Sequence, residues 1–227
     1  MNVALTLFAG AALGLAAGSL LVPLTRRELA ASVARSTATD APMATTDLPA
    51  PRIAGHRVAL AGVSGLLLAY VLYRVGWSFN ALPPLLLLVG LVQLAYCDVT
   101  RRLLPKTLVY ALTIAVVASG VLVAVGTGEW TRLVLATLGG VVSFALFFVV
   151  NLMNPRWMAF GDVRLSLVFG FGLAWVSPID LFEAFLYANL LALFTGLVLV
   201  VAHRADRRSA LPFGLFMALG AALVLVT

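Results

Sequence analysis

Two aspartates interrupt the apolar runs of this chain. Asp98 closes the run that ends in QLAYC, and Asp162 stands near the start of MAFGDVRLSLVFG. Two carboxylates held together in a low-dielectric site cannot both ionise easily, so they share a proton. One can then activate a water molecule as a general base while the other donates a proton to a carbonyl oxygen. The pair therefore has the residue types for acid–base hydrolysis of an amide bond.

A structural explanation is available for each aspartate taken alone. Asp98 could pair with Arg101 or Arg102, and Asp162 with Arg164, or either could cap a helix. The neighbours nevertheless suit a reactive site. Gly161 leaves room beside Asp162 for a substrate backbone, and Pro105 suits the first position of the helix that follows Asp98. The remaining acidic residues lie in loops, turns or an outer helix start: Glu28, Asp40, Asp47, Glu129, Asp180, Glu183 and Asp206.

The elements that carry these aspartates are predicted from hydropathy. The chain has 227 residues, 63% of them hydrophobic and 11% charged, and its mean hydropathy is +1.08. Such values are typical of a polytopic membrane protein. We expect an all-α helix bundle with about eight transmembrane helices in one membrane domain, residues 1–227. The apolar runs lie at 3–24, 57–75, 81–97, 107–126, 133–153, 163–177, 181–202 and 210–226.

The basic residues predict the orientation of the bundle. No basic residue precedes the first run, and Arg26 and Arg27 follow it, which favours an N-terminus outside the membrane. Thirteen of the fifteen Lys and Arg residues then fall on the cytoplasmic side, in agreement with the positive-inside rule. Asp98 and Asp162 would both lie at the cytoplasmic membrane face. The segment 26–56, rich in Ala, Ser, Thr and Pro, is expected to be a flexible cytoplasmic linker.

The same composition limits the partners and cofactors. The net charge of +6 reports membrane topology here, so we predict no nucleic-acid partner. Cys97 is the only cysteine, which excludes a disulfide within the chain and a CxxC zinc site. We predict neither a metal nor a cofactor, and the sequence specifies no oligomeric state.

Four segments in order resemble the prepilin peptidases, or type IV leader peptidases, which are GxGD-type membrane aspartic proteases. The Asp98 segment is similar to the first catalytic motif, an aspartate followed seven residues later by the proline of a Leu-Pro pair. The Asp162 segment is similar to the GxGD motif, although Ala159 replaces its first glycine, Arg164 replaces a common lysine, and Lys106 follows Pro105 where Asp or Asn is common. The segments are GLAAGSLLVPLTRREL, CDVTRRLLPK, AFGDVRL and LPFGLFMALGA.

The resemblance implies a specific activity. Asp98 and Asp162 would be catalytic, with Gly161, Pro105 and Arg164 giving substrate access or supporting the motifs. The substrate would be a prepilin or pilin-like precursor, with a basic leader and a glycine before the scissile bond, processed in the bilayer of the bacterial cytoplasmic (inner) membrane. Many members also have paired CxxC motifs and an N-methyltransferase activity. The linker lacks cysteine, so we predict the peptidase and make no prediction about methylation.

Other classes of protein explain fewer of these residues. The string GVSG at 62–65 matches a rhomboid-type serine protease motif, but Ser64 needs a histidine base, and His56 and His203 lie in or next to loops. The chain has no HExxH motif or histidine cluster for a metalloprotease. A transporter or scaffold could use Asp98 and Asp162 in a polar pathway. Transporter sites, however, usually lie near the membrane midplane and not at one face.

Overall fold

The computed structural model describes residues 69, 78–101, 106–154, 159–201 and 213–226. In these ranges a short 3-10 turn, η1 (Phe79–Ala81), is followed by six α-helices and no strand. The predicted all-α class is confirmed. The helices are α3 (Leu82–Arg101), α4 (Lys106–Thr127), α5 (Trp130–Met153), α6 (Phe160–Ala174), α7 (Pro178–Val201) and α8 (Phe213–Val226). The predicted span 3–24, the linker 26–56 and, apart from Ala69, the predicted span 57–75 lie outside the described residues.

Four of the helices are long and apolar enough to cross a membrane: Phe79–Asp98, Lys106–Thr127, Trp130–Met153 and Pro178–Val201. Helices α6 and α8 are shorter, with 15 and 14 residues. At about 1.5 Å per residue they fall short of about 30 Å of hydrocarbon. Six of the eight predicted spans therefore coincide with a described helix, and the four long ones fit a multi-pass membrane protein.

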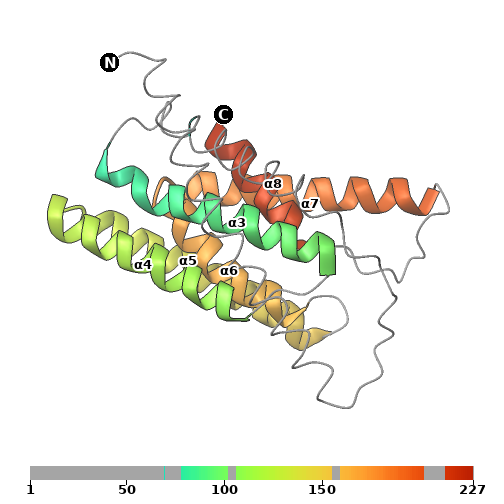
Figure 1. Cartoon of the computed structure of the whole chain (residues 1–227). Helices are drawn as coiled ribbons and strands as arrows, with labels where there is room; N and C mark the ends of the chain where they lie inside the picture. Colours follow the sequence, from blue (N-terminus) through green and yellow to red (C-terminus); the bar gives the residue numbers. More distant parts are fainter. Residues whose placement is uncertain (1–68, 70–77, 102–105, 155–158, 202–212, 227) are drawn as a thin grey trace.

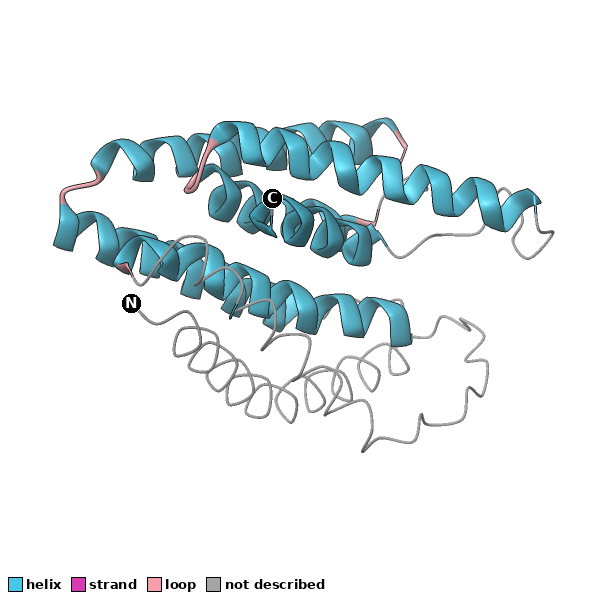
Figure 2. Cartoon of the chain, turned by 90° about the horizontal axis from the view of Figure 1, so that it is seen from above, coloured by secondary structure: helices cyan, strands magenta, loops and turns pink. Residues whose placement is uncertain are grey.

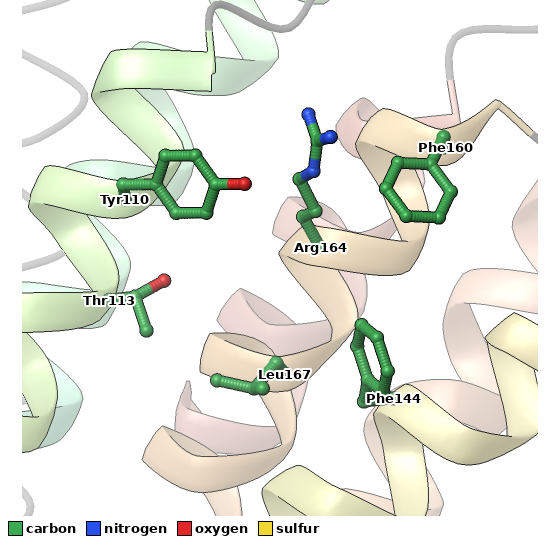
Figure 3. A pocket seen from close by; sticks show the side chains of 6 residues that line it. All are labelled: Tyr110, Thr113, Phe144, Phe160, Arg164 and Leu167. Atoms are coloured by element: carbon green, nitrogen blue, oxygen red, sulfur yellow. The ribbon is translucent and has the colours of Figure 1, made fainter.

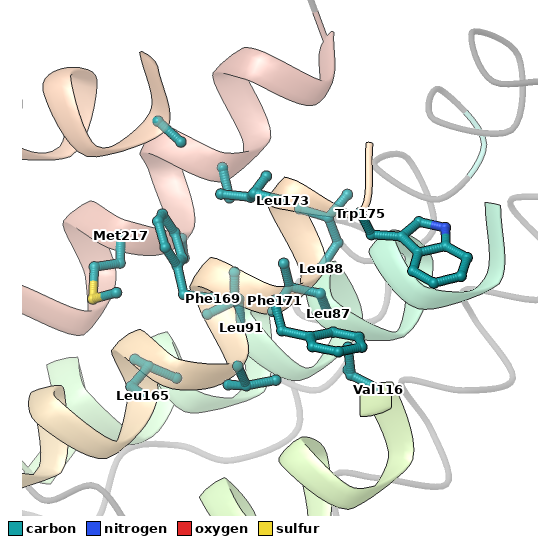
Figure 4. Close-up of a cluster of buried hydrophobic side chains, with 14 of the residues drawn as sticks. Leu87, Leu88, Leu91, Val116, Leu165, Phe169, Phe171, Leu173, Trp175 and Met217 are labelled. Carbon is teal, nitrogen blue, oxygen red and sulfur yellow. The ribbon is translucent and has the colours of Figure 1, made fainter. Parts of the chain in front are cut away.

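Helix α6 forms the centre of the described bundle. It contacts α3, α4, α5, α7 and α8, and nearly all of its residues from Asp162 to Ala174 are buried. Figure 1 labels it among the longer helices, and Figure 2 shows the described helices as one bundle seen from above. Phe169 and Leu173 of α6 project into the apolar core, where Leu91 of α3 and Met217 of α8 meet them (Figure 4). A helix shielded by its neighbours on most sides does not have to match the thickness of the lipid.

Small residues allow α5 and α6 to approach closely. Gly139 and Ser143 on α5 lie against Gly170 and Ala174 on α6, and a Cβ placed on Gly170 would overlap Ser143 and the Gly139 carbonyl. On each helix the two small residues are four positions apart, which is the small-xxx-small spacing of closely packed membrane helices. Ser166 adds a polar link, because its Oγ donates to the Val163 carbonyl at 2.8 Å and lies 3.3 Å from the Ser143 carbonyl. The glycine-rich sequence of α6 is thus a packing surface.

The end of the bundle away from the aspartates is closed by a tight turn and a hydrogen bond. Gly128 joins α4 to α5 with φ of +77°, a left-handed conformation that a side chain would strain. Its amide donates to the Ala124 carbonyl at 2.9 Å, which ends α4. Trp175, just after α6, donates its indole N–H to the Asn80 carbonyl at 3.0 Å. The start of the α3 segment is thereby fixed to the end of α6.

Candidate active site

Asp162 lies in the first turn of α6. Ala159 precedes the helix in an extended conformation, and the Asp162 amide donates to the Ala159 carbonyl at 3.0 Å. A carboxylate in a first turn is favoured by the positive end of the helix dipole. The side chain is nonetheless turned inward and is only 7% exposed. Gly161, immediately before it, is half-buried and places no side chain beside the carboxyl group.

Asp98 approaches the same region from the last turn of α3 and is also 7% exposed. Gly214, in the first turn of α8, lies directly against its side chain. A Cβ at position 214 would come within 2.9 Å of Asp98 Oδ2 and 3.7 Å of a Leu165 methyl carbon. Leu165 is three residues after Asp162 and shares its face of α6. The end of α3 and the starts of α6 and α8 therefore meet at one end of the bundle.

The two carboxyl groups are buried at the same end of the bundle, where α3, α6 and α8 meet. Asp162 is buried among apolar side chains, and Asp98 is the acidic group whose charge is near enough to act on it. Because the surroundings are largely apolar, water screens this interaction weakly. Placing two negative charges here is costly, and a single shared proton relieves the repulsion. Two aspartates that share one proton would provide one proton donor and one proton acceptor.

Arg164 does not neutralise Asp162. Residues two apart on an α-helix point to nearly opposite sides, and no ion pair joins these two side chains in the part of the chain that the structure describes. The Arg164 guanidinium instead lies over two aromatic rings, 4.5 Å from the centroid of Phe160 and 5.6 Å from that of Tyr110 (Figure 3). The ion-pair interpretation of Asp162 is therefore wrong for Arg164.

The other predicted site features have separate outcomes. Pro105 lies outside the described residues. No group of three or more His, Cys, Asp or Glu side chains that could hold a metal occurs within the described ranges. Gly214 belongs to the LPFGLF motif, but its contact with Asp98 is not predicted by the sequence, because a contact between α3 and α8 leaves no local signal in either segment.

Residues 85–201, just over half of the chain, match the type IV leader peptidase family. The chain belongs to this family. Both aspartates lie in the matched segment. A prepilin leader peptidase/N-methyltransferase of Stutzerimonas stutzeri is 26% identical over 160 residues, which cover 68% of this chain and 53% of that protein. A protein of the same name from Pseudomonas aeruginosa is 26% identical over 169 residues, which cover 72% and 55%.

The chain thus spans about half the length of the curated relatives it matches. No solved structure gives a significant match. The resemblance seen in the sequence motifs is confirmed at the level of the family.

Proposed function

We propose that this type IV leader peptidase family member is a membrane aspartic endopeptidase that removes the leader from prepilin-like precursors. The observation that carries the proposal is that two buried aspartates, Asp98 near the end of α3 and Asp162 at the start of α6, meet the start of α8 at one end of the bundle. Membership of the family supports the reaction type, and the names of the two relatives support the substrate class.

In the proposed reaction, the dyad holds one proton while a precursor peptide bond lies beside it. The ionised aspartate takes a proton from water, whose oxygen bonds to the scissile carbonyl carbon. The protonated aspartate donates to the carbonyl oxygen, giving a neutral gem-diol. Collapse of this intermediate breaks the C–N bond, with proton transfer to the leaving nitrogen. Gly161 gives the substrate backbone access to Asp162, and the shared proton returns to the dyad for the next cycle.

The position of the site suits a substrate that is itself embedded in the membrane. The predicted orientation puts the Asp98 and Asp162 end of the bundle at the cytoplasmic face of the bacterial inner membrane. A prepilin-like precursor would bring its basic leader and the following apolar helix to the same level. The scissile bond between these two segments would then lie beside the dyad without leaving the bilayer surface.

The test is cleavage of a prepilin-like precursor co-expressed with the full chain. We expect a shortened product with the native protein and none with Asp98→Asn or Asp162→Asn. Asp180→Asn is the matched control, because Asp180 begins α7 at the other end of the bundle, and this variant should cleave normally. Cleavage by either dyad variant at the native rate would refute the dyad.

A precursor left intact by the native protein would instead favour a transporter or scaffold. The mass of the new N-terminus decides methylation in the same experiment. A product heavier by one methyl group would assign the second activity as well.

A further inference from the structure

A hollow opens on the side of α6 that faces away from the two aspartates. Its volume is about 220 Å³, and it is lined by Tyr110 and Thr113 of α4, Phe144 of α5, and Phe160, Arg164 and Leu167 of α6 (Figure 3). The three α6 residues have i, i+4, i+7 spacing and so form one stripe. At about 30 Å³ per water molecule, the hollow has room for roughly seven waters, which is enough for a phosphate group.

The charge of this hollow is positive. Arg164 is the charged residue of the lining, and none of the described lining residues is acidic. The aromatic rings of Phe160 and Tyr110 hold the guanidinium through cation–π contacts, which leave its N–H groups able to bind an anion. Lys106 lies one turn before Tyr110 on the same side of α4 and is exposed. A second cation thus lies one helical turn from the lining residue Tyr110.

Polarity falls along α4 and α6, beside the hollow, from the end of the bundle towards its middle. On α4, Lys106 and Tyr110 are followed by Ile114, which is 69% exposed. On α6, Arg164 is followed by Leu167, which lines the hollow together with Phe144 of α5 (Figure 3). A phospholipid has the same order, with its phosphate at the membrane surface and its acyl chains below. Exposed apolar side chains continue along α4 and α5, as expected where these helices face lipid.

We infer that this hollow binds the phosphate group of an anionic phospholipid, with Arg164 as its main ligand. Basic pockets between transmembrane helices on the cytoplasmic side are suited to such headgroups. Because the dyad lies on the opposite side of α6, the lipid and the proposed substrate would occupy separate places. A lipid bound here would fix the first turns of α4 and α6 relative to each other. The inference does not depend on the proposed peptidase activity.

Retention of lipid by the purified full chain tests this inference directly. The protein is exchanged into phosphatidylcholine vesicles containing one-fifth phosphatidylglycerol, extracted, and measured by native mass spectrometry. We expect the native protein to retain phosphatidylglycerol in preference to phosphatidylcholine. Arg164→Gln should lower this retention about fivefold, while Arg164→Lys should keep most of it. Arg132→Gln is the matched control, because Arg132 is a partly exposed arginine that pairs with Glu129 at 3.2 Å, and it should retain lipid normally.

Three results would overturn the inference. The first is unchanged lipid retention by a folded Arg164→Gln variant, and the second is a loss of lipid retention in Arg132→Gln as large as that in Arg164→Gln. The third is displacement of the lipid by millimolar inorganic phosphate, which would make the hollow a site for free anions. If Arg164→Gln does not fold, Tyr110→Leu serves in its place, since it removes one aromatic support and leaves the charge. Retention by folded Tyr110→Leu equal to that of the native protein would then contradict the inference.

Discussion

Gly214 of α8 lies against the carboxyl group of Asp98 at the end of α3, so closely that a Cβ at position 214 would come within 2.9 Å of Oδ2. Contacts this short require one of the two groups to move. The position of one proposed catalytic carboxylate is therefore set by the absence of a side chain on another helix. The glycine belongs to the LPFGLF segment, which gives that motif a physical reason.

Replacement of this glycine should impair cleavage more than folding. In Gly214→Ala, the new methyl group displaces the Asp98 carboxyl group, and a displacement of about 1 Å can lower a rate about a hundredfold. We expect a reduced kcat for precursor cleavage, with little change in KM or in the unfolding temperature. Gly126→Ala is the control, since nothing lies within 4 Å of a Cβ at that position of α4. Equal kcat values for the two variants would show that Gly214 does not position Asp98.

A substitution at the contact between α5 and α6 should lower the stability of the fold and not the rate of the reaction. In Gly170→Ala, the methyl group would overlap Ser143 and the Gly139 carbonyl, and overpacking of this kind costs about 1–3 kcal/mol. Thermal unfolding in detergent should show a lower midpoint than for the native protein, whereas Gly126→Ala should not. A midpoint as high as that of the native protein would indicate that the two helices are farther apart than described.

Trp175 provides a test at the end of the bundle away from the aspartates. Trp175→Phe removes the indole hydrogen bond to the Asn80 carbonyl, which is worth about 1 kcal/mol, and leaves a small void because the side chain is only 1% exposed. We expect a lower midpoint of thermal unfolding, but an unchanged kcat for precursor cleavage by the folded protein. A selective loss of kcat at normal stability would mean that this end of the bundle also contributes to the reaction.

Hydropathy predicted the helices better than it predicted their roles. Long apolar runs mark membrane spans directly. The predicted run 107–126 corresponds to α4, Lys106–Thr127, and the run 133–153 corresponds to α5, Trp130–Met153. The predicted run 163–177 corresponds to α6, Phe160–Ala174. The helix begins three residues before the predicted run because its first turn contains the polar residue Asp162. Polar residues that begin a buried helix are invisible to a search for apolar runs.

The candidate site was partly accessible from the sequence. Asp98 and Asp162 were singled out as charges in apolar surroundings, and the opposite directions of Asp162 and Arg164 follow from the turn of a helix alone. The approach of Gly214 to Asp98 joins residues more than a hundred positions apart. Such a contact depends on how three helices pack, and one sequence contains no local pattern for it.

The central claim is that Asp98 and Asp162 act as one unit, and the most direct test compares single and double variants. Precursor cleavage is measured with purified native protein, Asp98→Asn, Asp162→Asn and the double variant. Loss of general acid–base catalysis lowers a rate about a hundredfold to ten-thousandfold, and residues that act as a unit are not additive. We predict that each single variant loses as much activity as the double variant. Independent losses whose factors multiply in the double variant would contradict a shared-proton dyad.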